Sequence, residues 1–284
     1  MRKPFFALIA VVLLLAACQK ESSLENPNSG PGGSPSNPNV GSLRRLVTVA
    51  GGDSTAVDLS YDASNRLTFY NVTAVDPDEN AYVRVTRNNA GIITRYVSNN
   101  EGLLSRGLDS LVTNLFYNTA QSRYTYGLAA YTESGTTYFD STAYTYNGAG
   151  NLTVKTTYLR VGPSPYVPYQ KSEYTYAGGN VLSEKYYFIN ATTNVLDLEY
   201  TLNYTYDDKV NPLKLGTEAL ILIDDAMYFG NNNASAINFV DATDPTNTFG
   251  ANIAYSYNSA NKPAGGTATQ AGGGSTYALR YYYN

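Results

Sequence analysis

A repeat of about thirty residues runs through most of this chain of 284 residues. Most units are marked by a tyrosine followed by Asn or Asp, as in Tyr61-Asp62, Tyr146-Asn147 and Tyr206-Asp207. The seven anchor positions are 61, 87, 117, 146, 176, 206 and 257, and successive anchors lie 26, 30, 29, 30, 30 and 51 residues apart. A period of this length means that one supersecondary unit is used many times.

The residues inside each unit predict a β-hairpin. Between Leu196 and Tyr206 every even position is apolar or aromatic and every odd position is polar, which is typical of a strand with one buried face. Asn, Asp and Gly follow the anchor, and these residues close tight turns. A second alternating segment then returns, as in 152–158. One unit is therefore two antiparallel strands, and Leu196, Leu198, Tyr200, Leu202, Tyr204 and Tyr206 should share the buried face.

The pattern predicts an all-β fold, an antiparallel up-and-down meander of about 12–14 strands. The repeat alone leaves open whether this meander closes into a barrel or stays a curved sheet. One segment near 217–230 breaks the alternation and should be short and helical or irregular, with Thr217 and Gly230 as candidate caps.

The N-terminus reads as an export and anchoring signal. Arg2 and Lys3 precede a 13-residue apolar run that is too short to span a bilayer, and the run ends at Cys18, the single cysteine of the chain. This order resembles a bacterial lipobox, which implies that residues 1–17 are a signal peptide and that Cys18 is acylated. Gln19, Lys20 and Glu21 resemble a surface-export signal. Residues 18–41 are rich in Ser, Asn, Pro and Gly and should form a disordered tether, which leaves 42–284 as the β-repeat domain.

Composition excludes several classes of function. The chain has no histidine and one cysteine, so the commonest general base, imidazole metal sites and Ser-His-Asp triads are all missing. A net charge of −4 argues against a nucleic-acid partner. We therefore expect a protein that is not an enzyme, with no cofactor, no metal site and no catalytic residue.

Three acidic motifs are each better explained as turns or surface groups than as sites. The run 76–80 offers alternating oxygens but lacks the Gly and distant Glu of a calcium loop. Asp207-Asp208 lies where a turn is expected. Asp224-Asp225 is a candidate carboxylate pair, but neighbouring side chains diverge on a strand or a helix.

The 28 tyrosines have two interpretations. Rows of Tyr can pack on a pleated surface and fill a core. An exposed row could instead stack on sugar rings, although the absence of Trp weakens that interpretation.

The repeat resembles the Tyr-Asp (YD) repeats of RHS-type proteins, seen in Tyr61-Asp62-Ala63-Ser64-Asn65-Arg66-Leu67-Thr68. Residues 140–284 also resemble a Bacteroidota outer-membrane lipoprotein domain of unknown function with a porin-like fold. The resemblance is carried by Tyr204–Asp208 leading into Asn211-Pro212, the Asn pair at 232–233, and Tyr255–Asn258 leading into Pro263. Gly230 departs from the expected pattern. The resemblance implies architecture and compartment, and it transfers no catalytic residue.

These observations together predict a non-enzymatic outer-membrane or cell-surface lipoprotein used for binding or structure, joined to the membrane through its lipid anchor. One alternative is a glycan-binding accessory lipoprotein whose partner is an extracellular polysaccharide. The other is a transmembrane porin-like β-barrel. Alternating strands of ten residues have the right length for such a barrel. Two features argue against it: the tyrosines are spread along the strands, and a barrel that inserts by itself gains little from a lipid anchor.

Overall fold

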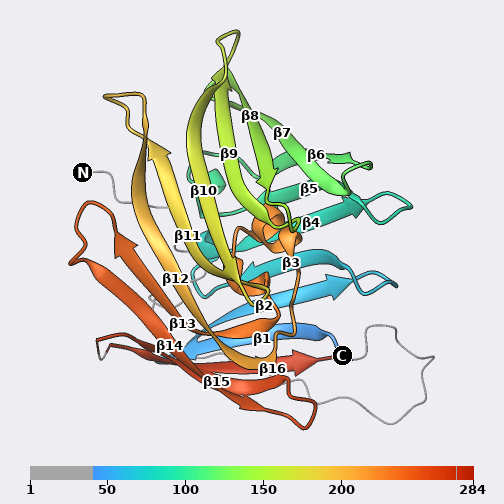
Figure 1. Cartoon of the computed structure of the whole chain (residues 1–284), viewed down its shortest axis with the longest axis vertical. Helices are drawn as coiled ribbons and strands as arrows, with labels where there is room; N and C mark the ends of the chain where they lie inside the picture. Colours follow the sequence, from blue (N-terminus) through green and yellow to red (C-terminus); the bar gives the residue numbers. More distant parts are fainter. Residues whose placement is uncertain (1–40, 273) are drawn as a thin grey trace.

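The computed structural model describes residues 41–272 and 274–284, and these form a closed barrel of sixteen antiparallel strands (Figure 1). Each strand pairs with the next along the chain, and the last pairs with the first. The strands are β1 (Leu43–Ala50), β2 (Asp53–Tyr61), β3 (Leu67–Thr73), β4 (Ala81–Arg87), β5 (Ile93–Asn99), β6 (Leu111–Asn118), β7 (Arg123–Glu133), β8 (Thr136–Tyr146), β9 (Leu152–Val161), β10 (Val167–Ala177), β11 (Asn180–Ile189), β12 (Leu196–Val210), β13 (Asn232–Asp241), β14 (Thr248–Tyr257), β15 (Pro263–Gln270) and β16 (Thr276–Tyr283). Four short helical turns complete the fold of the described residues: η1 (Pro77–Glu79), α2 (Glu101–Leu104) and the pair η2 and η3 described below.

The all-β meander is confirmed, and it closes into a barrel with more strands than the predicted 12–14. Seven anchors predicted at most seven hairpins. The missing unit is split between the two ends of the described chain, because β16 ends in Tyr283-Asn284 and its partner strand is β1. The Asn284 N–H donates to the Ser42 carbonyl and the Gly41 N–H donates to the Asn284 carbonyl, both at 3.0 Å. Tyr283 is thus an eighth anchor.

Several tyrosine anchors of the repeat share one structural role, shown by their hydroxyl groups. Each of the seven anchors predicted from the sequence follows directly after a register shift in its hairpin, a β-bulge whose extra residue lies in the returning strand. Tyr61 donates to the Leu43 carbonyl at 2.8 Å, Tyr206 to the Val181 carbonyl at 2.6 Å, and Tyr283 to the Pro263 carbonyl at 2.8 Å. The accepting residues are fully buried, so these anchors tie their hairpins to the preceding ones. Tyr257 donates instead to the Asp207 carboxylate, and the Tyr146 hydroxyl is buried without a hydrogen-bond partner among the described residues.

The residue after the anchor closes the turn. The Asn147 Oδ1 accepts the N–H groups of Ala149 and Asn151, both at 3.0 Å, and Asn88 does the same for Ala90 and Ile92. Side-chain oxygens of Asn and Asp satisfy turn donors in this way. The sequence repeat therefore has a physical basis in which Tyr joins neighbouring hairpins and Asn or Asp shapes the turn.

The strand alternation puts apolar side chains inside the barrel. On β12, Tyr200, Leu202 and Tyr204 are buried and Asn203 is exposed, as predicted. The prediction is wrong for Leu198, because the β11–β12 register skips one residue there and places Leu198 opposite Tyr187. A bulge reverses the phase of the alternation. Leu196 and Leu198 are consequently only half-buried.

The outer face of the barrel carries charge at the middle of its strands. Register and alternation place Arg84 on β4, Lys185 on β11 and Arg280 on β16 outside, and all three are exposed. Lys171 and Glu173 on β10 pair with each other at 2.8 Å on the same outer face. The Lys171 ammonium lies 3.9 Å from the centre of the Tyr187 ring. The outer surface therefore carries charged side chains at mid-strand, beside exposed apolar residues such as Phe116 and Leu182.

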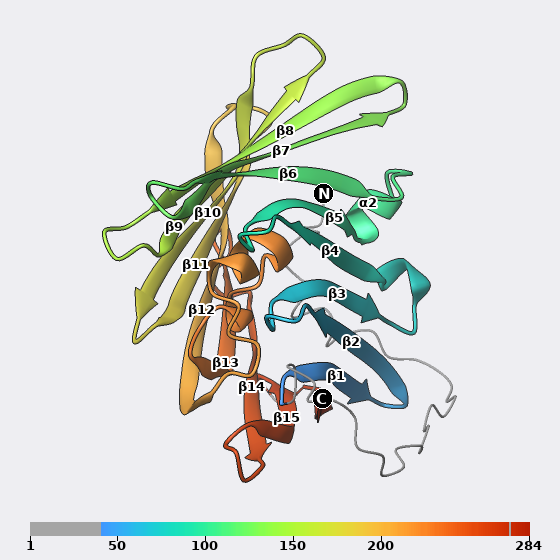
Figure 2. The same ribbon diagram turned by 90° about the vertical axis from the view of Figure 1, so that its right-hand side faces the viewer.

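The segment between β12 and β13 folds into the barrel as a plug, which we define as residues 211–231. It contains a single π-helical turn, η2 (Ala219–Ile223), and a 3-10 turn, η3 (Ala226–Tyr228). Figures 1 and 2 show this orange segment enclosed between the walls of the barrel. Leu220 and Ala226 are fully buried in the common core, since the segment's apolar residues meet the inward faces of the strands. This confirms the short helical or irregular segment predicted near 217–230.

An ion pair fixes the plug to the wall. Arg87, the one anchor that is not Tyr, is only 7% exposed in its side chain and makes two hydrogen bonds to Glu218, at 2.6 and 2.7 Å. Its guanidinium also donates to the Leu67 carbonyl at 3.2 Å, as a tyrosine anchor would. This exception to the repeat is therefore explained by its contact with the plug.

The predicted signal peptide, Cys18, the export signal at Gln19, Lys20 and Glu21, and most of the tether lie outside the described residues. Within the described part of the chain, no helix has the length and apolar character needed to cross a membrane.

Candidate ligand site in the barrel interior

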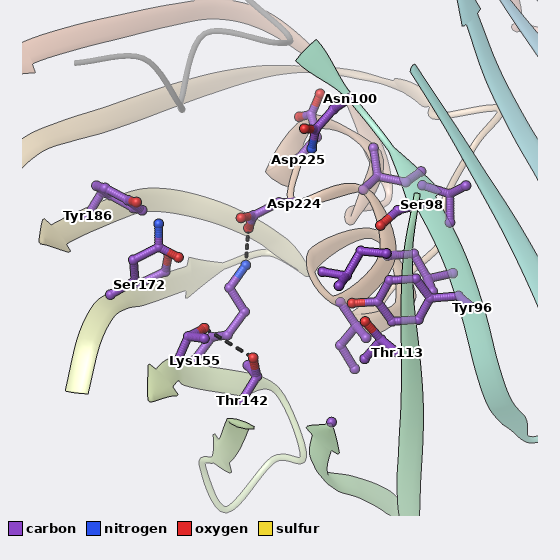
Figure 3. Close-up of a pocket in the computed structure, with 18 of the residues that line it drawn as sticks. Tyr96, Ser98, Asn100, Thr113, Thr142, Lys155, Ser172, Tyr186, Asp224 and Asp225 are labelled. Atoms are coloured by element: carbon purple, nitrogen blue, oxygen red, sulfur yellow. Dashed lines mark hydrogen bonds and ion pairs between the residues drawn. The ribbon is translucent and has the colours of Figure 1, made fainter. Parts of the chain in front are cut away.

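A cavity of about 310 Å³ lies inside the barrel beside the plug. Strands β3–β13 contribute its walls, and η2 and η3 form one side. Figure 3 shows Tyr96, Ser98 and Thr113 on one wall, and Lys155, Ser172 and Tyr186 on the other, with Asp224 and Asp225 from the plug between them. The cavity is thus lined by tyrosines, hydroxyl groups and charged side chains from many strands.

An ion pair in the cavity joins the barrel wall to the plug. The Lys155 ammonium forms an ion pair with the Asp224 carboxylate, and the Tyr174 hydroxyl donates to the same carboxylate at 3.3 Å. Asp224 ends η2 in a left-handed conformation with φ of 59°, which Asp tolerates better than most residues. That conformation turns its side chain from the end of η2 toward β9.

Glu184 is the most deeply buried acid of the cavity, with an exposed fraction of 4%. Desolvation and the nearby Asp224 carboxylate raise the pKa of Glu184 to about 8, although Lys155 and Ser172 act in the opposite direction. No ion pair joins Glu184 to another residue of the described chain. Its carboxyl group is therefore poised to change charge near neutral pH.

Two further acids line the cavity without a cation at ion-pair distance in the described chain. Burial raises the pKa of Asp140 to about 6, with Arg106 acting weakly against this shift. The Asp140 Oδ1 is buried and has no hydrogen-bond partner among the described residues. Burial also raises the pKa of Asp225 to about 6, while its Oδ1 accepts the Met227 N–H at 2.8 Å and so caps η3.

Tyrosine rings complete the lining. Tyr186 and Tyr200 stack with ring centres 4.9 Å apart. Tyr200 and Tyr204 are 5% and 6% exposed and Tyr144 is 9% exposed. Within the described residues, the hydroxyl groups of these three make no hydrogen bond to the protein. The tyrosine rows therefore face inward, which supports packing as their main role and does not form an exposed stacking platform.

The acidic motifs of the sequence fall into two groups. Residues 76–80 form the η1 turn, with Asp76 as its N-cap, and the Asp207 Oδ1 accepts the Lys209 and Asn233 N–H groups at 2.9 and 3.1 Å. Residues 76–80 are a turn, as expected. The turn predicted at Asp207-Asp208 is wrong, because both residues lie within β12, where its pairing with β13 is irregular between Tyr206 and Val210. Asp224 and Asp225 instead both line the cavity. Among the described residues, no three His, Cys, Asp or Glu side chains are grouped as a metal site would require.

Sequence reasoning missed Lys155, Glu184 and Asp140. The available signal was a charged residue in the inward phase of a strand. The sequence does not show which residues of a returning strand point inward. Each hairpin has a β-bulge near its anchor, and the position of that bulge, which decides the alternation after it, cannot be recognised in the sequence.

Comparison with known proteins identifies the fold. No family model and no curated protein sequence matches this chain. A porin-like protein from Bacteroides vulgatus has a similar structure, with a TM-score of 0.52 and 11% identity over 85% of this chain and 98% of that chain. A porin-like protein from Bacteroides uniformis gives a TM-score of 0.51 and 11% identity, over 84% of this chain and 96% of the other. The chain therefore has the porin-like β-barrel fold.

Proposed function

We propose that the protein is a non-enzymatic lipoprotein of the outer membrane, anchored through Cys18, whose barrel stands in water and binds a small ligand in its interior cavity. The observation that carries this proposal is the polarity of the two barrel faces. The inward face is mostly tyrosine and aliphatic around a polar cavity, and the outward face has charge at mid-strand.

The outward charges argue against insertion of the barrel in lipid. A transmembrane barrel presents an apolar band to the lipid, and an Arg or Lys at the midplane costs about 2–4 kcal/mol. Here Arg84, Lys185 and Arg280 lie outward near the middle of their strands. Three such residues would oppose insertion strongly, whereas in water they cost nothing.

The interior also differs from that of a pore. A porin has a polar, water-filled lumen. In this barrel the plug packs Leu220, Ile221 and Leu222 against the inward faces of the strands, and all three are buried. The cavity that remains has the size and lining of a ligand site.

The anchor and the tether explain how a water-exposed barrel stays at the membrane. Cleavage before Cys18 leaves a thiol for acylation, and a tether ending near residue 41 holds the domain away from the lipid. Gln19, Lys20 and Glu21 would direct the protein to the cell surface. A polysaccharide partner bound on an exposed tyrosine row is not favoured, because the tyrosine rows face inward.

Detergent phase separation of the full-length protein and its Cys18→Ser variant tests the proposal. We expect the native protein in the detergent phase and the variant in the aqueous phase, because the acyl chains alone would provide the membrane affinity. The variant is made without residues 1–17, so that no apolar signal segment remains. If it still stays in the detergent phase, the barrel itself inserts and the proposal is overturned.

A further inference from the structure

The charges of the cavity are out of balance. Its lining residues include four acids and two lysines, Asp140, Glu184, Asp224, Asp225, Lys155 and Lys171, and the ammonium of Lys171 lies on the outer face. Both lysines have carboxylate partners, since Lys155 pairs with Asp224 and Lys171 pairs with Glu173 on the outer face. Asp140, Glu184 and Asp225 are left without a cation at ion-pair distance in the described chain.

A second, independent observation points to a ligand at the same place. Tyr200 and Tyr204 are more than nine-tenths buried, line the cavity, and have hydroxyl groups without a protein hydrogen bond among the described residues. Their hydroxyl oxygens are not among the fully buried unpaired atoms of the described chain, so they open into the cavity, where a ligand can bond them. Both lie on β12 next to Glu184, which is directly opposite Leu202. Acceptor groups and aromatic faces therefore converge on one region.

We propose that this cavity binds a small organic ammonium ion, held by the Glu184 carboxylate and the tyrosines around it. The inference rests on the proposed function and names the ligand class of the same cavity. An ammonium group gives N–H donors to carboxylate and hydroxyl oxygens and interacts favourably with tyrosine ring faces. A neutral polyol would satisfy the hydroxyl groups but would leave the excess of carboxylates uncompensated.

Every polar group that faces Glu184 bears on its response to a cation: Lys155 from β9, Ser172 and Tyr174 from β10, Tyr186 from β11, Tyr200 and Tyr204 from β12, and Asp224 and Asp225 from the plug. Lys155 is the one cation of this group. Because it is engaged by Asp224, an incoming ammonium ion would be the first direct counter-ion of Glu184. Binding would then favour the charged carboxylate and expel the proton that Glu184 carries at neutral pH.

Isothermal titration calorimetry with 1,4-diaminobutane and 1,4-butanediol tests the ligand class. The two probes share a skeleton and differ in ammonium against hydroxyl. With the purified full-length protein in non-ionic detergent at about pH 7, we expect saturable binding of the diamine and none of the diol. Titrations in two buffers of different ionisation enthalpy should show release of up to about one proton per diamine bound.

Matched variants assign the effect to the cavity. Glu184→Gln keeps the size of the side chain, and we expect it to weaken diamine binding by about tenfold or more and to abolish proton release. Glu173→Gln makes the same change on the outer face of the adjacent strand and should alter affinity by less than about twofold. Circular dichroism of both variants establishes that the barrel is intact.

Three outcomes would overturn the inference: no saturable diamine binding, equal binding of the diol, or full affinity in Glu184→Gln. Equal binding of the diol would leave the proposed ligand-binding function standing and change the ligand class to polyols. Failure of the proposed function itself is seen separately, in the detergent partition of Cys18→Ser.

Discussion

Two parts of the barrel share one backbone plan and differ in what they present to the interior. The apolar wall, the inward positions of β2–β4, carries Val57, Leu59, Tyr70, Val72, Val83 and Val85, all of them buried. The polar wall, the inward positions of β8–β11, carries Asp140, Thr142, Lys155, Thr157, Ser172 and Glu184.

Both walls have the same turns and the same anchors. Tyr61 and Tyr176 each donate to the carbonyl of a fully buried residue in the preceding hairpin, Leu43 and Leu152. This comparison shows that the repeat determines the backbone of the barrel, that is, its hairpins, turns and anchor contacts. The inward positions away from the anchor are then free to become core on one side and a polar site on the other.

The largest expected effect comes from placing the same acid in both walls. Val72→Asp should destabilise the fold by about 3–5 kcal/mol, because Val72 is 1% exposed and a carboxylate there has no partner. Thr157→Asp should cost less, about 2 kcal/mol, since Thr157 lines the polar cavity. The change loses the 3.1 Å hydrogen bond to Thr142 and adds a carboxyl group near acids that already lack a cation. Chemical denaturation of both variants measures the difference, and equal costs would contradict the division into two walls.

The second prediction concerns the pH dependence that only the polar wall should confer. The folded-state pKa of Glu184 is about 8 against an unfolded value of 4.5, so the folded state binds the proton more tightly. This contribution to stability is fully present below about pH 4.5 and is lost as the pH rises through about 8. Asp140 and Asp225, with pKa values of about 6, act in the same direction at lower pH.

Glu184→Gln should remove most of that dependence. Relative to the native protein, the variant should gain stability on the order of 2 kcal/mol between about pH 5 and pH 9. The free energy of unfolding measured across this range provides the test. Glu173→Gln is the control, because its carboxyl is paired with Lys171 and its pKa is lowered. A parallel pH profile for Glu184→Gln and the native protein would show that Glu184 is not held in its acid form.

Most strands and turns could be predicted from the sequence, because they depend on short-range patterns of residues. Strict alternation over 196–206 and an Asn or Asp after each tyrosine are short-range signals for strand and turn. The even spacing of Tyr146, Tyr176 and Tyr206 predicts consecutive hairpins, and β8–β12 confirm them.

The same short-range patterns could not predict the closure of the barrel or the residues of the cavity. The pairing of β1 with β16 joins the two ends of the described chain, so no local pattern records it. The phase of Lys155 and Glu184 depends on bulges, and the phase of Leu198 on the bulge between β11 and β12. The plug looked like an interruption in the alternation. Only its packing against many strands shows that it lies inside.

The third prediction sharpens the comparison by testing what the walls share. Tyr61→Phe, beside the apolar wall, and Tyr206→Phe, beside the polar wall, each remove a hydroxyl that donates to a buried carbonyl. Both should cost about 1 kcal/mol, because the ring stays packed and one hydrogen bond is lost. Tyr282→Phe, at an exposed position, should change stability by less than about 0.5 kcal/mol. A large difference between the first two would mean that the anchors are not equivalent.

The smallest expected effect concerns the turn residues, which also occur in both halves. Asn88→Ala and Asn147→Ala each remove an oxygen that accepts two turn N–H groups at 3.0 Å. The turns are exposed, so water can replace part of what is lost, and each change should cost about 0.5–1 kcal/mol. Asn89→Ala, at an exposed neighbouring position, is the matched control and should be close to neutral. Thermal or chemical unfolding of the three variants measures the differences. If Asn147→Ala were neutral while Asn88→Ala were costly, the hairpins of the polar wall would be shaped by their inward side chains, and the shared frame would hold only on the apolar side.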